Sequence, residues 1–142
     1  MQPETYDIQQ LIPQRSPIVM VDKLLRVQGD EAVCQLTVRE DNYFLEADSR
    51  LAEVGLIEHI AQSASAFAGY RAMKNSDATE PPVGYIGEVK HFHLSQRPAV
   101  GDTLQTTIQM GPEVQGVTII QGRTQCGDKL VAETQMKIFI KD

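Results

Sequence analysis

Hydrophobic residues alternate with polar ones along much of the chain, and this pattern predicts strands on both sides of one long helical segment. Between positions 32 and 38 every second residue is apolar and its neighbours are mostly polar, which predicts a half-buried strand. Just before it, the nearly continuous apolar run at 18–25 predicts a strand covered on both faces. Residues 6–12 predict a short helix or turn that ends at Pro13, and Gly29-Asp30 predicts a turn between the two strands.

The segment from Leu51 to about Lys74 predicts a long helix instead of a strand. Glu53 falls in its first turn, where the helix dipole favours a carboxylate, and Asp48 or Ser49 is expected to cap its start. The middle of the segment is apolar or small around nearly the whole circumference, which indicates a buried helix. We therefore expect strands to approach this helix closely and to wrap around it.

Four further strands are predicted after the Pro81-Pro82 loop. They are expected at 85–95, 103–110, 117–125 and 130–140, separated by turns that contain glycine or proline. Two strands, one long helix and four strands together predict an α+β fold in which a curled antiparallel sheet encloses the helix. The length of 142 residues predicts one domain, spanning 1–142.

Composition narrows the function classes. A net charge of −6 argues against nucleic acid as a partner, because phosphate binding needs a concentrated basic face. We expect neither a signal peptide nor a membrane span, since the start is not basic and no apolar run approaches about 20 residues. Two cysteines suit a reducing compartment, so we expect a cytoplasmic protein. The three histidines form no zinc pattern, and we expect no metal and no other cofactor.

Glu58 is the first candidate for chemistry, because an ionised carboxylate in the apolar middle of a helix is unfavourable unless it is paired or used. Gln62 and Ser65 share its helical face and form a narrow polar stripe with it. Such a stripe also arises where a helix faces water through a gap in a sheet, or where it satisfies the backbone of a loop. His59 points about 100° away from Glu58, so we expect it to be a core or dimer-interface residue.

The remaining histidines and the cysteines are expected to be structural. His91 and His93 alternate on one predicted strand and are expected to be structural or exposed. Cys34 and Cys126 have no basic neighbour in sequence that would lower a thiol pKa, so we expect both to be packing residues of strands.

Four segments resemble the motifs of one enzyme family, the 3-hydroxyacyl-[acyl-carrier-protein] dehydratases. Residues 11–22, LIPQRSPIVMVD, resemble its opening motif of Leu-Ile-Pro-His-Arg, a variable residue, Pro, an apolar run and Val-Asp. Residues 55–62 resemble its central-helix motif, and the Glu of that motif falls on Glu58. Residues 97–104 resemble its Arg-Pro-Val-Val-Pro-Gly-Asp turn, one residue shorter, and 131–133 match its ending.

This resemblance implies the hot-dog fold, a two-fold dimer with sites at the subunit interface, and an acyl thioester of acyl carrier protein or coenzyme A as the ligand. It implies fatty acid or polyketide-type biosynthesis as the setting. It also implies a catalytic role for Glu58 and substrate binding by Arg15, Gly55 and Gln62.

The match departs from the family pattern where the base is expected. The family's catalytic histidine falls on Gln14, and the shorter segment Leu45–Arg50 replaces the family's Gly-His-Phe-Pro loop. Glutamine cannot take up a proton near neutral pH. Because general acid–base catalysis contributes about 10²–10⁴ in rate, the two-residue dehydration mechanism is expected to be crippled.

Three hypotheses therefore stay open. The chain is a dehydratase-like lyase in which Glu58 acts alone or with a histidine that the sequence does not place. Alternatively, it is an acyl thioesterase in which Glu58, helped by Gln62, activates water. In the third hypothesis it is a non-catalytic acyl-binding partner subunit, and a second hot-dog chain supplies the histidine. We expect a homodimer or a heterodimer with another hot-dog chain, because a single curled sheet leaves an edge strand open.

Overall fold

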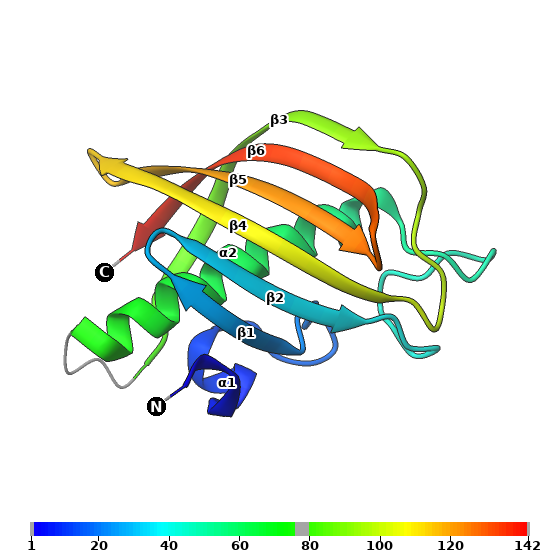
Figure 1. Cartoon of the computed structure of the whole chain (residues 1–142), viewed down its shortest axis with the longest axis horizontal. Helices are drawn as coiled ribbons and strands as arrows, with labels where there is room; N and C mark the ends of the chain where they lie inside the picture. Colours follow the sequence, from blue (N-terminus) through cyan, green and yellow to red (C-terminus); the bar gives the residue numbers. More distant parts are fainter. Residues whose placement is uncertain (1, 76–79, 142) are drawn as a thin grey trace.

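A computed structural model describes residues 2–75 and 80–141. Its elements in chain order are η1 (Pro3–Thr5), α1 (Ile8–Leu11), β1 (Lys23–Gln28), β2 (Glu31–Thr37), α2 (Glu53–Asn75), β3 (Val83–Leu94), β4 (Thr103–Val114), β5 (Val117–Cys126) and β6 (Lys129–Lys141). Within these residues, six strands form one antiparallel sheet in the order β1-β2-β4-β5-β6-β3. The sheet curls over α2 (Figure 1), which confirms the predicted α+β arrangement.

The alternation of apolar residues located most elements well. The predicted helix from Leu51 to about Lys74 is α2, and Glu53 and Lys74 lie in its first and last turns as expected. The five strands predicted from position 32 onward correspond to β2 through β6 and end within four residues of their predicted bounds. The predicted short helix at 6–12 is α1, and its start is capped by the Asp7 carboxylate, which accepts from the Gln9 N–H at 2.9 Å.

The first predicted strand was placed wrongly. Residues 18–22 are not part of a strand, and β1 begins only at Lys23. The physical reason is that side chains of α2 bond the backbone at Ile18 and Met20, while Asp22, just before β1, donates its N–H to the Gln35 carbonyl of β2 at 2.8 Å. Gln62 donates to the Ile18 carbonyl at 2.8 Å, and the Met20 N–H donates to the Gln62 side-chain oxygen at 2.6 Å. Residues 18–20 thus lie on the helix, and bonding to β2 begins at Asp22.

The predicted caps of α2 were also wrong. The helix begins at Glu53, four residues after Ser49, and the Ala52 carbonyl accepts from the Gly55 N–H at 3.0 Å. Asp48 does not cap the helix, because its carboxylate is paired with the Arg97 guanidinium. That partner lowers the pKa of the Asp48 carboxyl.

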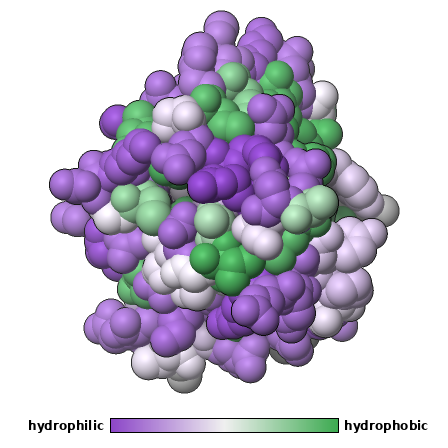
Figure 2. All heavy atoms as spheres, turned by 90° about the vertical axis from the view of Figure 1, so that its right-hand side faces the viewer, coloured by the Kyte–Doolittle hydropathy of each residue, from purple (hydrophilic) through white to green (hydrophobic). Residues whose placement is uncertain are grey.

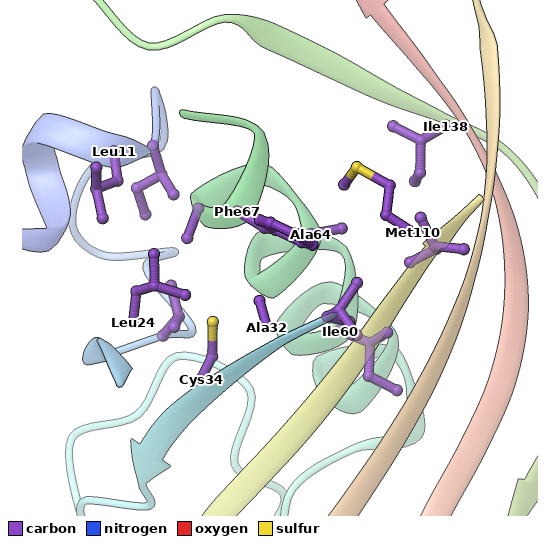
Figure 3. Close-up of a cluster of buried hydrophobic side chains, with 14 of the residues drawn as sticks. Leu11, Leu24, Ala32, Cys34, Ile60, Ala64, Phe67, Met110 and Ile138 are labelled. Atoms are coloured by element: carbon purple, nitrogen blue, oxygen red, sulfur yellow. The ribbon is translucent and has the colours of Figure 1, made fainter. Parts of the chain in front are cut away.

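The core lies between α2 and the concave face of the sheet. Figure 3 shows Ala64 and Phe67 of α2 with Leu11 on one side of the helix and Met110 and Ile138 on the other. Small residues bring the layers close together, as predicted. A Cβ atom at Gly69 would lie 2.0 Å from the Leu11 carbonyl oxygen, and one at Gly122 would lie 2.5 Å from Ile60.

Two strands, β1 and β3, form the edges of the sheet in the described part of the chain. Exposed apolar residues occur on β3, where the Tyr85 side chain is 57% exposed. The end of the molecule on the right of Figure 1 is mainly hydrophilic and carries small hydrophobic patches (Figure 2). None of the helices formed by residues 2–75 and 80–141 is long and apolar enough to cross a membrane.

Candidate active site

A cavity of about 210 Å³ lies between α2 and the sheet. Four residues of α2 line the cavity, namely Glu58, Ala61, Ser65 and Ala68. They are spaced by three or four residues and therefore lie on one face of the helix, which is turned to the cavity. Of the predicted polar stripe, Glu58 and Ser65 line the cavity, whereas Gln62 does not. The opposite wall is apolar and includes Met110, Ile120 and Ile138. The cavity is therefore a mostly hydrophobic slot with a carboxylate on its helical side.

Gln14 lines the same cavity as Glu58, although the two residues are far apart in sequence. Its side-chain oxygen is buried and has no hydrogen-bond partner among residues 2–75 and 80–141. A buried acceptor of this kind normally has a partner, so it marks a place where a bound molecule or water would donate. The structure thus brings Glu58 together with Gln14, the residue at the position of the family's catalytic histidine.

Arg15 does not line this cavity in the described structure. Its guanidinium donates to the carbonyls of Ile12 at 2.7 Å, Gln14 at 2.8 Å and Gln9 at 3.0 Å. These bonds hold the turn after α1, which carries Gln14. The contacts of Arg15 are therefore with the protein's own backbone, beside the residue that faces the cavity.

Gln62 fixes the orientation of Glu58. The Gln62 side chain is fully buried, and its NH₂ group donates to the Glu58 Oε1 and to the Ile18 carbonyl, both at 2.8 Å. Its oxygen accepts from the Met20 N–H, so the amide cannot be flipped without directing two donors at each other. One carboxylate oxygen of Glu58 is thus held in place, and Gln62 stands behind the cavity wall.

His59 belongs to a separate, buried hydrogen-bond chain. Its Nδ1 lies 2.6 Å from the Met20 carbonyl oxygen, and its Nε2 lies 2.7 Å from the Thr106 hydroxyl. A carbonyl only accepts, so Nδ1 carries the proton and Thr106 donates to Nε2. The Thr124 hydroxyl lies 2.6 Å from that of Thr106 and extends the chain into β5. Burial lowers the pKa of His59 to about 4. The prediction that His59 is a structural core residue is confirmed.

Gly55 and the segment Leu45–Arg50 are held by contacts with other residues of the protein. A Cβ atom at Gly55 would lie 2.7 Å from the Cβ of Phe44, so a side chain would not fit there. Its N–H is already bonded within the first turn of α2. Arg97 holds the segment 45–50 through Asp48 and through Glu46, whose Oε1 lies 2.9 Å away. The segment that replaces the family loop is therefore pinned to the turn before β4.

The remaining candidates do not contribute to the cavity. His91 and His93 are exposed, in line with the prediction. Burial raises the pKa of the Cys34 thiol to about 12 and, to a lesser degree, that of Cys126, so neither is primed as a nucleophile. In the parts of the chain that the structure describes, no group of three or more His, Cys, Asp or Glu side chains is placed to hold a metal ion.

Sequence reasoning missed the threonines on the inner face of the sheet. Thr106, Thr118 and Thr124 are all buried, and each occupies an inward position of its strand. The signal was present, because Thr106 lies between the buried Leu104 and Ile108 in a period of two. A polar residue at such a position needs a partner or a ligand.

The curled sheet around a long buried helix, with a cavity along the helix, defines a protein of the hot-dog fold. A sequence model of the ApeP-like family, described as ApeP dehydratase, matches residues 6–142, and the chain belongs to this family. The resemblance to the 3-hydroxyacyl-[acyl-carrier-protein] dehydratases is confirmed by relatives of that name. FabZ of Clostridium kluyveri is 23% identical over 141 residues, covering 96% of this chain and 94% of the relative. FabZ of Syntrophotalea carbinolica is 26% identical over 139 residues, covering 94% and 92%.

Solved structures support the same fold. The dehydratase heterocomplex ApeI:P from Xenorhabdus doucetiae contains a chain that superimposes with a TM-score of 0.88 at 16% identity, covering 96% of this chain and 92% of that one. The PaaI protein of the E. coli phenylacetic acid degradation operon gives a TM-score of 0.61 at 15% identity, covering 82% and 80%.

Proposed function

We propose that this chain is a subunit of a dehydratase for 3-hydroxyacyl thioesters, and that a second hot-dog chain completes its site. The observation that carries the proposal is the common position of Glu58 and Gln14 on one apolar cavity beside α2. The apolar wall suits an acyl chain, and the carboxylate suits its polar end. Acyl carrier protein would carry the thioester, in line with the names of the FabZ relatives. Coenzyme A is the alternative carrier.

Dehydration removes a proton from the carbon next to the thioester and a hydroxyl group from the following carbon. A base takes the proton, the new double bond forms as the carbon–oxygen bond breaks, and an acid protonates the departing hydroxyl to give water. Glu58 would be the acid, since Gln62 holds one of its oxygens at 2.8 Å and the cavity reaches the carboxylate. The unpaired oxygen of Gln14 would accept a hydrogen bond from the 3-hydroxyl and so position it.

The base is proposed to come from a second hot-dog chain. Within residues 2–75 and 80–141 no histidine lines the cavity, and the buried His59 is occupied by two hydrogen bonds. The edge strand β3 begins at this cavity, because Gly84, Tyr85 and Ile86 line it. A partner strand added to that edge would bring new side chains to the cavity mouth. The related ApeI:P structure is a dehydratase heterocomplex, which supports a heterodimer over a homodimer.

The test is to assay the purified chain alone and mixed with a hot-dog dehydratase chain that carries a histidine. Each sample is given 3-hydroxyacyl and saturated acyl thioesters, and enoyl product and free thiol are followed separately. We expect enoyl product from the mixture, little from the chain alone, and no thiol release. Rapid dehydration by the chain alone would remove the need for a second chain. Thiol release that disappears in Glu58→Gln would instead identify a thioesterase.

A further inference from the structure

The side of the sheet that points away from α2 (Figure 1), which we call the outer face, carries many uncharged polar side chains. On β4 they are Thr103, Gln105, Thr107 and Gln109. Within residues 2–75 and 80–141, the amide of Gln121 on β5 donates to Gln135 on β6 at 2.9 Å, whereas those of Gln105 and Gln109 have no partner. An amide both donates and accepts, so such a face can form hydrogen bonds with a copy of itself.

One end of the outer face is apolar. Ile119 on β5 and Phe139 on β6 are 41% and 44% exposed, and Phe139 is the cross-strand neighbour of Val117. The Phe139 ring also lies against Gly87 of β3, where an added Cβ atom would come within 2.1 Å of it. Exposed apolar side chains that lie together, unlike single ones, indicate a surface that contacts another protein.

The middle of the outer face carries two opposite charges. Arg123 on β5 and Glu133 on β6 are directly opposite each other, but their nearest charged atoms are 3.7 Å apart and both side chains are substantially exposed. Gln121 and Arg123 line two hollows of about 390 and 440 Å³. One hollow lies over β4 and the other over β6 and β3, so Gln121 and Arg123 form a ridge between them.

We propose that the outer face binds a second copy of this chain, back to back, about a two-fold axis that runs between β5 and β6. Such an axis lays β5 of each copy over β6 of the other, because these two strands are neighbours. Arg123 of each copy then faces Glu133 of the other, so the opposite charges meet twice. The ridge of each copy enters the hollow over β6 of the other, and Phe139 covers Val117 of the second copy.

The charge and the size of the outer face fit this arrangement. The chain has a net charge of −6, so two copies repel each other least where charges are absent or paired. The four strands β4, β5, β6 and β3 lie about 4.8 Å apart, and the 10 residues of β5 span about 34 Å, which gives roughly 650 Å² per copy. A standard interface uses about 800 Å² per partner, so we expect a weak association that depends on concentration.

This inference does not depend on the proposed function. It needs no thioester, and it leaves the edge of β3 free for a second hot-dog chain. The experiment is sedimentation equilibrium of the purified chain over a hundredfold range of concentration. Arg123→Glu and Glu133→Arg each place like charges opposite each other in both contacts. Mixing the two variants makes the charges complementary again, and so does combining both changes in one chain. Lys23→Glu, exposed on β1 and away from the outer face, is the control with the same change of charge as Arg123→Glu.

We expect the mass of the wild type to double with rising concentration. Each single charge variant should weaken this step by at least tenfold, and the mixture and the double variant should restore it, whereas Lys23→Glu should leave it unchanged. Ile119→Ser should also weaken the step, so the inference stays testable if a charge variant fails to fold. A mass that does not double, or a doubling that the folded variants leave unchanged, would overturn the inference. A mixture that associates as weakly as either single variant would overturn the pairing of Arg123 with Glu133.

Discussion

Polar side chains on the two faces of α2 differ in how completely they are hydrogen-bonded within the protein. On the face that packs against the sheet without the cavity in between, which we call the sheet-facing side, both nitrogens of His59 are bonded, and the Ser63 hydroxyl donates to the His59 carbonyl at 2.8 Å. On the face turned to the cavity, the hydroxyl of Ser65 has no partner within the described residues, and Glu58 has one oxygen bonded to Gln62. Glu58 and Ser65 are half-buried and line the cavity. The comparison teaches that polar groups on one face are satisfied by the protein itself, whereas those on the other face stay accessible from a cavity.

Gln62 connects the two faces. Its amide orients the Glu58 carboxylate on one side and holds the Ile18–Met20 segment on the other, beside the His59 contact to the same Met20. Changes on the sheet-facing side should therefore alter stability, whereas changes on the cavity-facing side should alter function.

The largest expected effect is on the cavity-facing side. Glu58→Gln keeps the size of the side chain but removes the proton that dehydration needs, so turnover of the completed dehydratase should fall by about 10²-fold or more. The free energy of unfolding should change little, because an amide can still bond to Gln62. Parallel measurement of turnover and of urea unfolding checks this, and Ser65→Ala serves as a control on the same face. Retained turnover would exclude Glu58 from the chemistry.

A change at His59 should have the reverse effect, lowering the free energy of unfolding and leaving thioester binding nearly unchanged. His59→Leu leaves the Met20 carbonyl and the Thr106 hydroxyl without their partner in a fully buried site, so the free energy of unfolding should fall by about 2–4 kcal/mol. Urea unfolding at neutral pH measures this loss. Where the variant is folded, thioester binding should remain within a few-fold of wild type. A variant as stable as wild type would show that the buried chain of hydrogen bonds contributes little.

Stability should also depend on pH through His59. Burial sets its folded pKa to about 4, against an ordinary value of 6.5. Between these values the unfolded chain binds a proton that the folded chain excludes. The stabilising contribution is therefore complete above about pH 6.5 and is lost as the pH falls toward 4, by on the order of 3 kcal/mol. Unfolding measured across this range should show the decline, and His59→Leu should flatten it. An equally steep decline in the variant would assign the effect to other groups.

The smallest expected effect is that of a change at Thr124, which ends the series of hydrogen bonds from His59 through Thr106. Thr124→Val keeps the shape of the side chain and removes its bond to the Thr106 hydroxyl, so it should lower the free energy of unfolding by about 1 kcal/mol. The measurement is again urea unfolding, with Thr107→Val, at a half-buried position of β4, as a comparison. A loss as large as that of His59→Leu would mean that the three residues act as one unit.

The order of elements could be predicted because it depends on local periodicity. The alternation in β2 and β4 and the uniformly small or apolar middle of α2 are visible along the chain without knowledge of its partners. Residues 18–22 were misplaced because the Ile18 carbonyl and both backbone groups of Met20 bond to side chains more than 35 residues away. An apolar run has the same composition whether it pairs with a strand or lies on a helix.

The candidate site could be predicted in part for a similar reason. Glu58 was found because a carboxylate within an apolar helix is conspicuous, and Gln14 was found through the family motif. The far wall of the cavity could not be found, because it is built from Met110 of β4, Ile120 of β5 and Ile138 of β6, and none of these residues is unusual in its own segment. Elements that are distant in sequence together create the cavity, and no periodicity records this.

The position of β3 at the sheet edge has a consequence for how the molecule forms. β3 is made before β4 and β5, yet its strand partner is β6, whose residues 129–141 follow them. Pairings so distant in sequence form slowly, and during synthesis β3 must wait for the later strands to emerge. Ile138 of β6 and Ile86 of β3 both line the cavity. The acyl cavity is therefore completed among the last features of the fold, when β6 closes the gap between β5 and β3.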